Sequence, residues 1–296
     1  MKFSKQKALG ITLTLQLLIY CVCALLLGAA SKKLNGSAML VLSCISAALT
    51  FAIPCLTYTY FTKTPVFRCI TVKKSSNNRT RNLSKNILTF IIAVSLTVTA
   101  VNIVGALTDL VASLFGISHE AAAPTGFVSL LLTFIRSVIL AAFFEELLFR
   151  GIVLNAFEST RNSRKLIISA LLFALMHYNL LSFFYAFVAG AILSYFAIRT
   201  GSVVFTMLVH LTQNLTVFIF SVLRVYLEAD VFGTASSVSF VIFAAVAVLG
   251  TMYLIAFELK SSKKCSDTAP TENHNALPRE LIIYIILAAV FTILNF

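Results

Sequence analysis

The chain has 296 residues, of which 59% are hydrophobic and 11% are charged. A soluble domain carries roughly 25% charged residues, so the composition excludes an ordinary soluble protein and indicates one embedded in a membrane. The net charge of +12 does not indicate a nucleic-acid partner, because Lys and Arg stand in the connections between apolar runs rather than on one folded face.

Apolar runs follow one another along most of the chain. A transmembrane helix needs about 20 mostly apolar residues, and about nine candidates, some of them short, cover 8–29, 37–61, 87–117, 126–145, 167–177, 180–198, 203–224, 236–257 and 281–296. The first run is too long for the apolar core of a typical signal peptide, so we expect a retained helix. We predict an all-α fold, a polytopic transmembrane bundle of about eight to nine helices that forms a single membrane domain over residues 1–296.

Basic residues predict the orientation of these helices, because cytoplasmic connections carry an excess of Lys and Arg. They are concentrated at the amino terminus, in 62–86, 146–166 and 258–280, and at Arg199. The acidic connections contain Glu120, Glu228 and Asp230. We therefore expect a cytoplasmic amino terminus, with 62–86 and 258–280 as a cytoplasmic loop and linker, although Lys32 and Lys33 oppose this orientation.

The cysteines contain no C-x-x-C pair and lie mostly in apolar runs, which indicates neither a disulfide framework nor a thiolate metal site. They are Cys21, Cys23, Cys44, Cys55, Cys69 and Cys265.

Ionisable residues inside membrane helices are costly and usually functional. The first such group, Glu145, Glu146 and Arg150, stands at the end of the fourth apolar run. At about 100° per residue, Arg150 lies about 40° from Glu146 but about 140° from Glu145, which predicts an ion pair between Glu146 and Arg150. That pair could simply end the helix at the membrane interface. Glu145 is left without this partner, at a cost of about 2.5 to 3.5 kcal/mol at mid-membrane, which suggests a task for its carboxylate.

Two further polar groups follow on neighbouring apolar runs. His177 ends one run, and His210 and Asn214 share a face of another, where Thr206 extends the polar stripe by one turn. Taken singly, a histidine at a helix end is often an interfacial residue, and His210 and Asn214 could make interhelical hydrogen bonds. Together, the three groups predict a hydrated pocket between the helices.

Other polar residues have structural interpretations. Asp109 and Arg136 fall inside the third and fourth runs and are expected to pair across helices, whereas His119 and His274 stand in polar connections and are expected to be solvated.

The three groups resemble the motifs of the CAAX-prenyl-protease type 2 and bacteriocin-processing family of intramembrane endopeptidases, also called the Abi or CPBP family. The family pattern is E-E-x-x-x-R, then F-x-x-x-H, then H-x-x-x-N, which reads here as Glu145, Glu146 and Arg150, then Phe173 and His177, then His210 and Asn214. The resemblance covers roughly 140–216, the expected catalytic core. Gly190 also fits, whereas Ser194 stands where relatives often have a second glycine. H-E-x-x-H and G-x-S-x-G are absent, which disfavours a zincin or a serine hydrolase.

The resemblance implies a glutamate that activates water, and we assign this role to Glu145 because Arg150 is expected to occupy Glu146. His177 would help to hold and deprotonate the water, while His210 and Asn214 would donate hydrogen bonds to the oxyanion. The expected supporting residues are Glu146, Arg150 and Phe173.

A metal ion remains an alternative within this family. Glu145, His177 and His210 could supply the two-histidine, one-carboxylate ligand set of catalytic zinc. We expect metal-independent chemistry, with one zinc ion as the alternative.

These observations predict a CAAX prenyl protease 2-like intramembrane endopeptidase in the cell membrane, with its site opening toward the cytoplasm. Its expected partners are the lipid bilayer and membrane-embedded or membrane-associated peptide substrates, whether prenylated (CAAX-type) or bacteriocin-like, and no nucleic acid. The alternative is a non-proteolytic bacteriocin-immunity or scaffold protein. A transporter is disfavoured, because pseudo-symmetric broken helices are not evident in the sequence.

Overall fold

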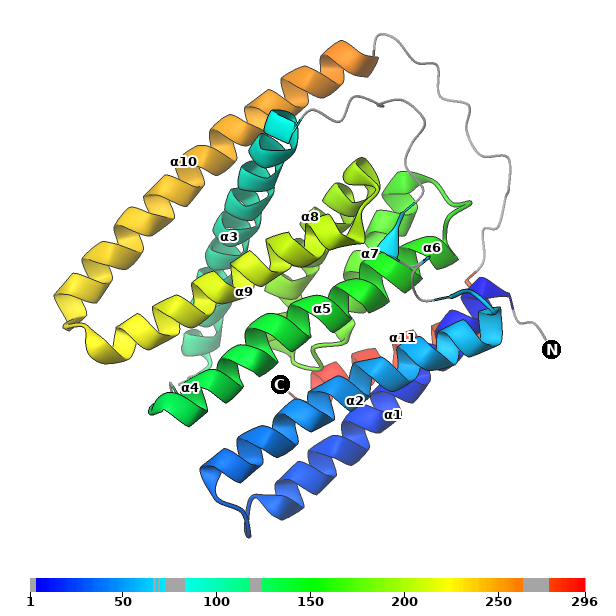
Figure 1. The fold of residues 1–296 in the computed structure, drawn as a ribbon, viewed down its shortest axis with the longest axis horizontal. Coiled ribbons are helices and arrows are strands. Elements are labelled where there is room, and N and C mark those ends of the chain that lie inside the picture. The colour runs from blue at the N-terminus through cyan, green and yellow to red at the C-terminus, as the bar shows by residue number, and fades with distance from the viewer. Residues whose placement is uncertain are drawn as a thin grey trace.

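The structure is a computed structural model, which describes residues 4–65, 68, 70–72, 83–117, 124–262 and 277–295. Figure 1 shows that this part of the chain folds as a helical bundle, which confirms the predicted all-α class. Its helices are α1 (Lys5–Ala30), α2 (Gly36–Thr62), α3 (Leu83–Leu114), α4 (Phe127–Phe134), η2 (Ile135–Leu140), α5 (Ala141–Glu146), η3 (Leu147–Val153), α6 (Leu154–Ala156), α7 (Asn162–Leu175), α8 (Leu180–Thr200), α9 (Val203–Tyr226), α10 (Ala229–Ser262) and α11 (Arg279–Leu294).

Helix length and composition identify the membrane spans. Within the described residues, 7 helical stretches are long and apolar enough to cross a bilayer. They are Lys5–Ala30, Gly36–Thr62, Ile87–Leu114, Phe127–Ala156, Leu180–Thr200, Val203–Tyr226 and Ala229–Phe257. The helices α7 and α11, with 14 and 16 residues, are shorter. The chain is therefore a multi-pass membrane protein.

The segments α4 to α6 form one continuous helix, Phe127–Ala156, with π-helical turns at η2 and η3. We refer to it as the composite helix. The predicted end of this helix at residue 145 is wrong, because the helix continues for eleven more residues. It can do so because Glu146 and Arg150 neutralise each other, and every residue of η3 is buried among apolar neighbours.

The composite helix occupies the middle of the bundle (Figure 1). On one side, η2 and α5 contact α2, which pairs with α1, and α1 in turn contacts α11. On the other side, η2 and α5 contact α9, and α3, α8 and α10 pack beyond it. The core of the first group continues from α1 through η3, α7 and α11. Residues on the composite helix can therefore meet side chains from both halves of the bundle.

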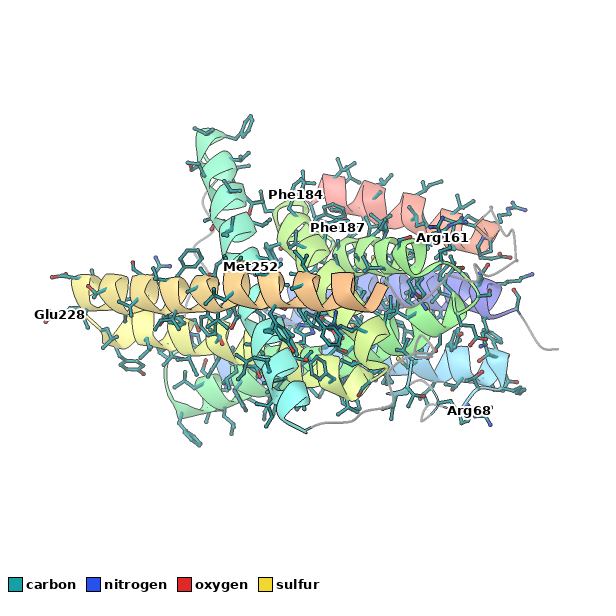
Figure 2. All side chains as sticks on the ribbon, turned by 90° about the horizontal axis from the view of Figure 1, so that it is seen from above. Arg68, Arg161, Phe184, Phe187, Glu228 and Met252 are labelled. Carbon is teal, nitrogen blue, oxygen red and sulfur yellow. The ribbon has the colours of Figure 1, made fainter. Side chains whose placement is uncertain are left out.

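The two ends of the bundle differ in charge. Figure 2 shows Arg68 and Arg161 near one end and Glu228 at the opposite end. At the basic end, Lys5 forms an ion pair with Glu158 at 2.9 Å. The side of the membrane that each end faces stays a prediction. His119, His274, Cys69, Cys265 and Glu120 lie outside the described residues, as do 73–82 of the predicted loop and 263–276 of the predicted linker.

Candidate active site

Glu146 and Arg150 form the predicted ion pair, one helical turn apart. Arg150 Nη1 lies 2.7 Å from Glu146 Oε1, and both side chains are completely buried. The pair is therefore internal, and its interpretation as an interfacial end of the helix is wrong. Arg150 Nη2 also donates to the backbone oxygen of Gly190 on α8, at 3.1 Å. The guanidinium thus joins the composite helix to α8.

Gly190 is needed because α7 and α8 approach each other closely. A Cβ atom at this position would lie 3.1 Å from both Ala170 Cα and Phe173 Cδ1, which is tighter than ordinary van der Waals contact. One turn later, Ser194 is fully buried, and its hydroxyl donates to Ser169 Oγ at 3.1 Å. Ser194 replaces the second glycine of the family pattern without an unpaired hydroxyl, because Ser169 accepts its hydrogen bond.

Phe173 is the aromatic centre of the site. Its ring lies under the Arg150 guanidinium, with 4.4 Å between Arg150 Cζ and the ring centroid. It also makes edge contacts with the imidazoles of His177 and His210, at centroid separations of 5.1 and 6.0 Å. An aromatic face attracts a cation while its edges pack against other rings. Phe173 therefore packs against Arg150, His177 and His210, all three of which belong to the sequence motifs.

His210 is tied to Glu146, which the sequence did not predict. His210 Nδ1 lies 3.0 Å from Glu146 Oε1, and His210 Nε2 lies 3.9 Å from Glu145 Oε2. Because the Glu146 carboxylate accepts from Arg150 as well, the proton of this contact belongs to His210 Nδ1. His210 can therefore donate to an oxyanion through Nε2 only when both of its ring nitrogens are protonated.

His177 lies in the turn between α7 and α8. Its Nδ1 is 2.9 Å from the backbone oxygen of Phe173, and a carbonyl oxygen only accepts, so Nδ1 carries the proton and Nε2 is available as an acceptor. The next residue, Tyr178, has a left-handed backbone with φ of 51°, a conformation that non-glycine residues rarely adopt. The buried Tyr178 hydroxyl donates to Gln16 Oε1 on α1 at 2.8 Å, which holds the turn in place.

A cavity of about 490 Å³ lies beside these residues, between α1, α2 and the composite helix. Glu145 and His177 line it, together with Gln16, Arg136 and Ser137. The side chains of His210 and Asn214 are not part of its lining. Asn214 Nδ2 instead donates to the backbone oxygen of Ser137 at 2.9 Å, which leaves the second N–H of that amide for another acceptor.

The predicted metal ligands do not make a ready metal site. Across the described residues, no group of three or more His, Cys, Asp and Glu side chains is arranged to hold a metal ion. Glu145, His177 and His210 are near one another, and the contacts of His210 with Glu146 and of His177 with a carbonyl each involve only Nδ1 of the ring. Nε2 of both histidines therefore stays available, as it is in histidines that bind a metal, so one zinc ion stays the alternative to metal-independent chemistry.

Comparison with protein families finds a match for the segment that contains these residues. Residues 127–216 match a family model described as type II CAAX prenyl endopeptidase Rce1-like. This segment of the chain resembles that family, and we call it the Rce1-like segment. It begins with α4, earlier than the predicted core of 140–216, and contains every motif residue from Glu145 to Asn214. The match confirms the resemblance predicted from the three motifs.

At the level of the family, the Rce1-like match supports a CAAX-type intramembrane protease. No curated protein and no solved structure matches the chain significantly. The helices α1, α2, α3, α10 and α11 lie outside the Rce1-like segment.

The expected ion pair between Asp109 and Arg136 is not present. Both side chains are exposed, Asp109 on α3 and Arg136 on η2, and the described residues include no ion pair between them. Arg136 instead lines the cavity that contains Glu145. The pairing was inferred from charge alone, and sequence does not show that η2 faces α1, α2 and α9 rather than α3.

Two residues that position the Rce1-like site were missed. Gln16 is a buried polar residue in the first apolar run, and Tyr178 directly follows a motif histidine. A glutamine among apolar residues was the available signal, since a buried amide needs a hydrogen-bond partner. Its partner, 162 residues away, could not be inferred from the sequence.

Proposed function

We propose that the protein is an intramembrane endopeptidase in which Glu145 and His177 activate a water molecule. One observation carries this proposal: Glu145 and His177 line the same cavity, while the neighbouring Glu146 is bound by Arg150 and His210. Two adjacent carboxylates thus have different environments. The carboxylate with access to the cavity is the one suited to act as a general base.

In the proposed reaction, water lies between the Glu145 carboxylate and His177 Nε2. Glu145 takes a proton as the water oxygen bonds to the carbonyl carbon of the substrate, and His177 Nε2 orients the water by accepting its other hydrogen. The tetrahedral intermediate then collapses with cleavage of the C–N bond. Protonated Glu145 returns its proton to the leaving amine, so that charge and protons balance.

The oxyanion of the intermediate needs hydrogen-bond donors. The second N–H of Asn214 is one candidate, and Nε2–H of doubly protonated His210 is the other. Asn214 is fixed to η2 through Ser137, and His210 is fixed to Glu146. Both donors would therefore be oriented before the substrate arrives, which lowers the cost of stabilising the charge that develops.

The proposed substrates are membrane-associated peptides, whether prenylated and CAAX-type or bacteriocin-like, because the cavity lies among membrane spans. The proposed reaction uses no metal ion. The proposed orientation places the amino terminus in the cytoplasm, from the bias in basic residues.

The variant Glu145→Gln tests the proposal, because it keeps the size and hydrogen-bonding capacity of the side chain but removes the base. Comparison of membrane proteomes from cells that contain wild-type or variant protein should show a cleaved species only with the wild type. Loss of the general base should slow cleavage by about 100- to 10,000-fold. Glu228→Gln, which removes a carboxylate at the far end of the bundle (Figure 2), is the control and should cleave normally.

If Glu145→Gln accumulates normally and cleavage continues at the wild-type rate, the role of Glu145 as the general base is refuted. A normal cellular phenotype without cleavage by either protein would favour the immunity or scaffold function instead.

A further inference from the structure

A groove runs from the proposed catalytic residues toward one end of the bundle. The 490 Å³ cavity begins at Gln16, Glu145 and His177 and extends to Leu27, Ser43 and Arg136. A larger cleft of about 760 Å³ is lined by the latter three residues and continues to Asn35, Ser37, Thr125 and Ser129. Because they share these lining residues, the two cavities are adjacent, and we call them together the α1–α2–α4 groove.

The outer end of this groove lies at the turn between α1 and α2 and at the start of α4. Figure 1 shows both elements on the side of the bundle opposite the N terminus. Hydroxyl groups line the groove along its length, from Ser43, Ser46, Thr50 and Ser137. The groove thus offers these hydroxyl groups to a peptide ligand between walls that are mostly apolar.

Arg136 stands where the two cavities join. Among the described residues that line the two cavities, Arg136 is the one Lys or Arg, and Glu145 is the one Asp or Glu. Across the described chain, no hydrogen bond or ion pair involves the Arg136 guanidinium. An unpaired guanidinium within a membrane span is costly, and such residues commonly mark the path of a substrate.

The π-helical turn explains how Arg136 and Glu145 come to line one cavity. Residues nine apart in a regular α-helix point in directions about 180° apart. The stretch η2 (Ile135–Leu140) contains Arg136 and precedes Glu145. It holds more residues per turn than an α-helix, which changes the phase of the side chains that follow. Both side chains therefore face the groove.

The spacing along this helix sets a length for the ligand. Nine residues at about 1.5 Å per residue separate Arg136 from Glu145 by about 13 Å along the helix axis. An extended peptide covers at most about 3.3 to 3.6 Å per residue. A group bound by Arg136 would therefore stand about four residues from the peptide bond at Glu145.

We propose that Arg136 determines specificity by binding a carboxylate of the substrate peptide, about four residues from the bond that is cleaved. A guanidinium matches a carboxylate in geometry and charge, since it can donate two parallel hydrogen bonds. The carboxylate is that of an acidic side chain or of the peptide's own C terminus. This inference rests on the proposed peptide-bond hydrolysis. It adds the chemical group of the substrate, a carboxylate, that the groove recognises.

The test compares peptides that differ in one charge. A panel of membrane-anchored peptides carries a carboxylate at positions about three to five residues from a common cleavage sequence. Each peptide has a Gln counterpart for an acidic side chain, or an amidated counterpart for a free C terminus, and this distinguishes the two sources of the carboxylate. Cleavage is measured in vesicles of zwitterionic lipid with purified wild-type protein, Arg136→Gln and the control Arg224→Gln, which lies on α9 and does not line the groove.

With a carboxylate peptide, Arg136→Gln should raise KM by about 10- to 100-fold, the effect of losing one charge-assisted hydrogen bond. The kcat should change little, because Arg136 does not contact the reacting atoms. The neutral counterpart should be cleaved equally by both proteins, and Arg136→Glu should instead prefer a peptide with Lys at that position. Arg224→Gln should behave as the wild type.

Equal KM changes for charged and neutral peptides, or none for either, would overturn the assignment of Arg136. So would an effect that appears only in vesicles with anionic lipid, which would identify a lipid phosphate as the ligand. If the wild type cleaves no peptide, the proposed hydrolysis fails separately, and direct binding of the same peptides to Glu145→Gln protein decides the role of Arg136. Binding that ignores the carboxylate would then refute it.

Discussion

The Tyr178 hydroxyl and the Gln16 side-chain oxygen lie 2.8 Å apart and join α1 to the turn that carries His177. Tyr178 is almost completely buried, and its ring packs against Tyr20 on α1 and Phe291 on α11. Helices outside the Rce1-like segment thus fix a residue inside it. The position of His177 depends on this contact, because Tyr178 follows it directly in a left-handed conformation.

Removal of this hydroxyl should therefore impair catalysis from a distance. In Tyr178→Phe, the Gln16 side chain loses its partner in the protein interior, at a cost of about 1 to 3 kcal/mol. We expect a lower kcat with little change in KM, measured on a peptide that the wild type cleaves. The control Tyr253→Phe alters a more exposed tyrosine on α10 and should have no effect.

A double substitution distinguishes a role in positioning His177 from a general loss of stability. Removing both partners, as in Gln16→Leu with Tyr178→Phe, leaves no unpaired amide at position 16 and should recover stability relative to Tyr178→Phe alone. If kcat stays low while stability recovers, the hydrogen bond positions His177. Normal kcat in Tyr178→Phe would show that the turn does not need it.

The buried ion pair makes a prediction about folding. Arg150→Ala would leave Glu146 without its cation and would remove the side-chain donor to the Gly190 carbonyl. Breaking a buried pair costs about 3 to 5 kcal/mol. We expect a much lower level of protein in the membrane, measured by immunoblot, and a lower Tm in detergent. Lys5→Ala breaks a partly exposed ion pair with Glu158 and should cost only about 0 to 1 kcal/mol. Wild-type abundance and activity of Arg150→Ala would contradict this role.

Chelation tests the proposed metal-independent reaction. Protein purified in detergent, where a buried ion is accessible, should keep its activity after exhaustive treatment with a chelator. A catalytic zinc ion would activate the bound water itself, so its removal would abolish cleavage. Loss of activity that added zinc restores would refute metal-independent chemistry.

The groove makes the orientation measurable with thiols, because Cys23 lines it. If the amino terminus is cytoplasmic, the groove opens on the opposite side of the membrane, which would replace the expectation of a cytoplasmic opening. In intact cells, a membrane-impermeant thiol reagent should label a variant that retains only Cys23. It should spare variants that retain only Cys69 or Cys265, and one that retains only the buried Cys55.

Strong labelling of Cys69 or Cys265 in intact cells would reverse the orientation. The groove would then open toward the cytoplasm, with its geometry unchanged.

The sequence predicted those parts of the site that depend on the periodicity of a single helix. The pairing of Glu146 with Arg150 needs only the helical repeat, and the separation of Glu145 from Arg150 follows from the same angle. The sequence also predicted that polar groups on neighbouring helices would meet, because hydrocarbon excludes them. The contact between His210 and Glu146 realises this expectation.

The remaining features depend on how helices face one another, which local pattern does not show. The sharing of Glu146 between Arg150 and His210 requires α9 to lie beside α5. The phase change at η2 has no signal in a run that reads as uniformly apolar, and it is what turns Arg136 toward the groove. Gln16 and Tyr178 are 162 residues apart in the sequence, so their contact forms only when the helices pack together.

The arrangement of the buried charges also bears on how the protein enters the bilayer. Glu146 and Arg150 lie on the same helix, so each can neutralise the other as soon as that segment leaves the translocon. Gly190 and His210, which complete the network, are synthesised later. The composite helix can therefore be inserted before α8 and α9 are synthesised. When these two helices pack against it, their contacts fix the position of an ion pair that has already formed.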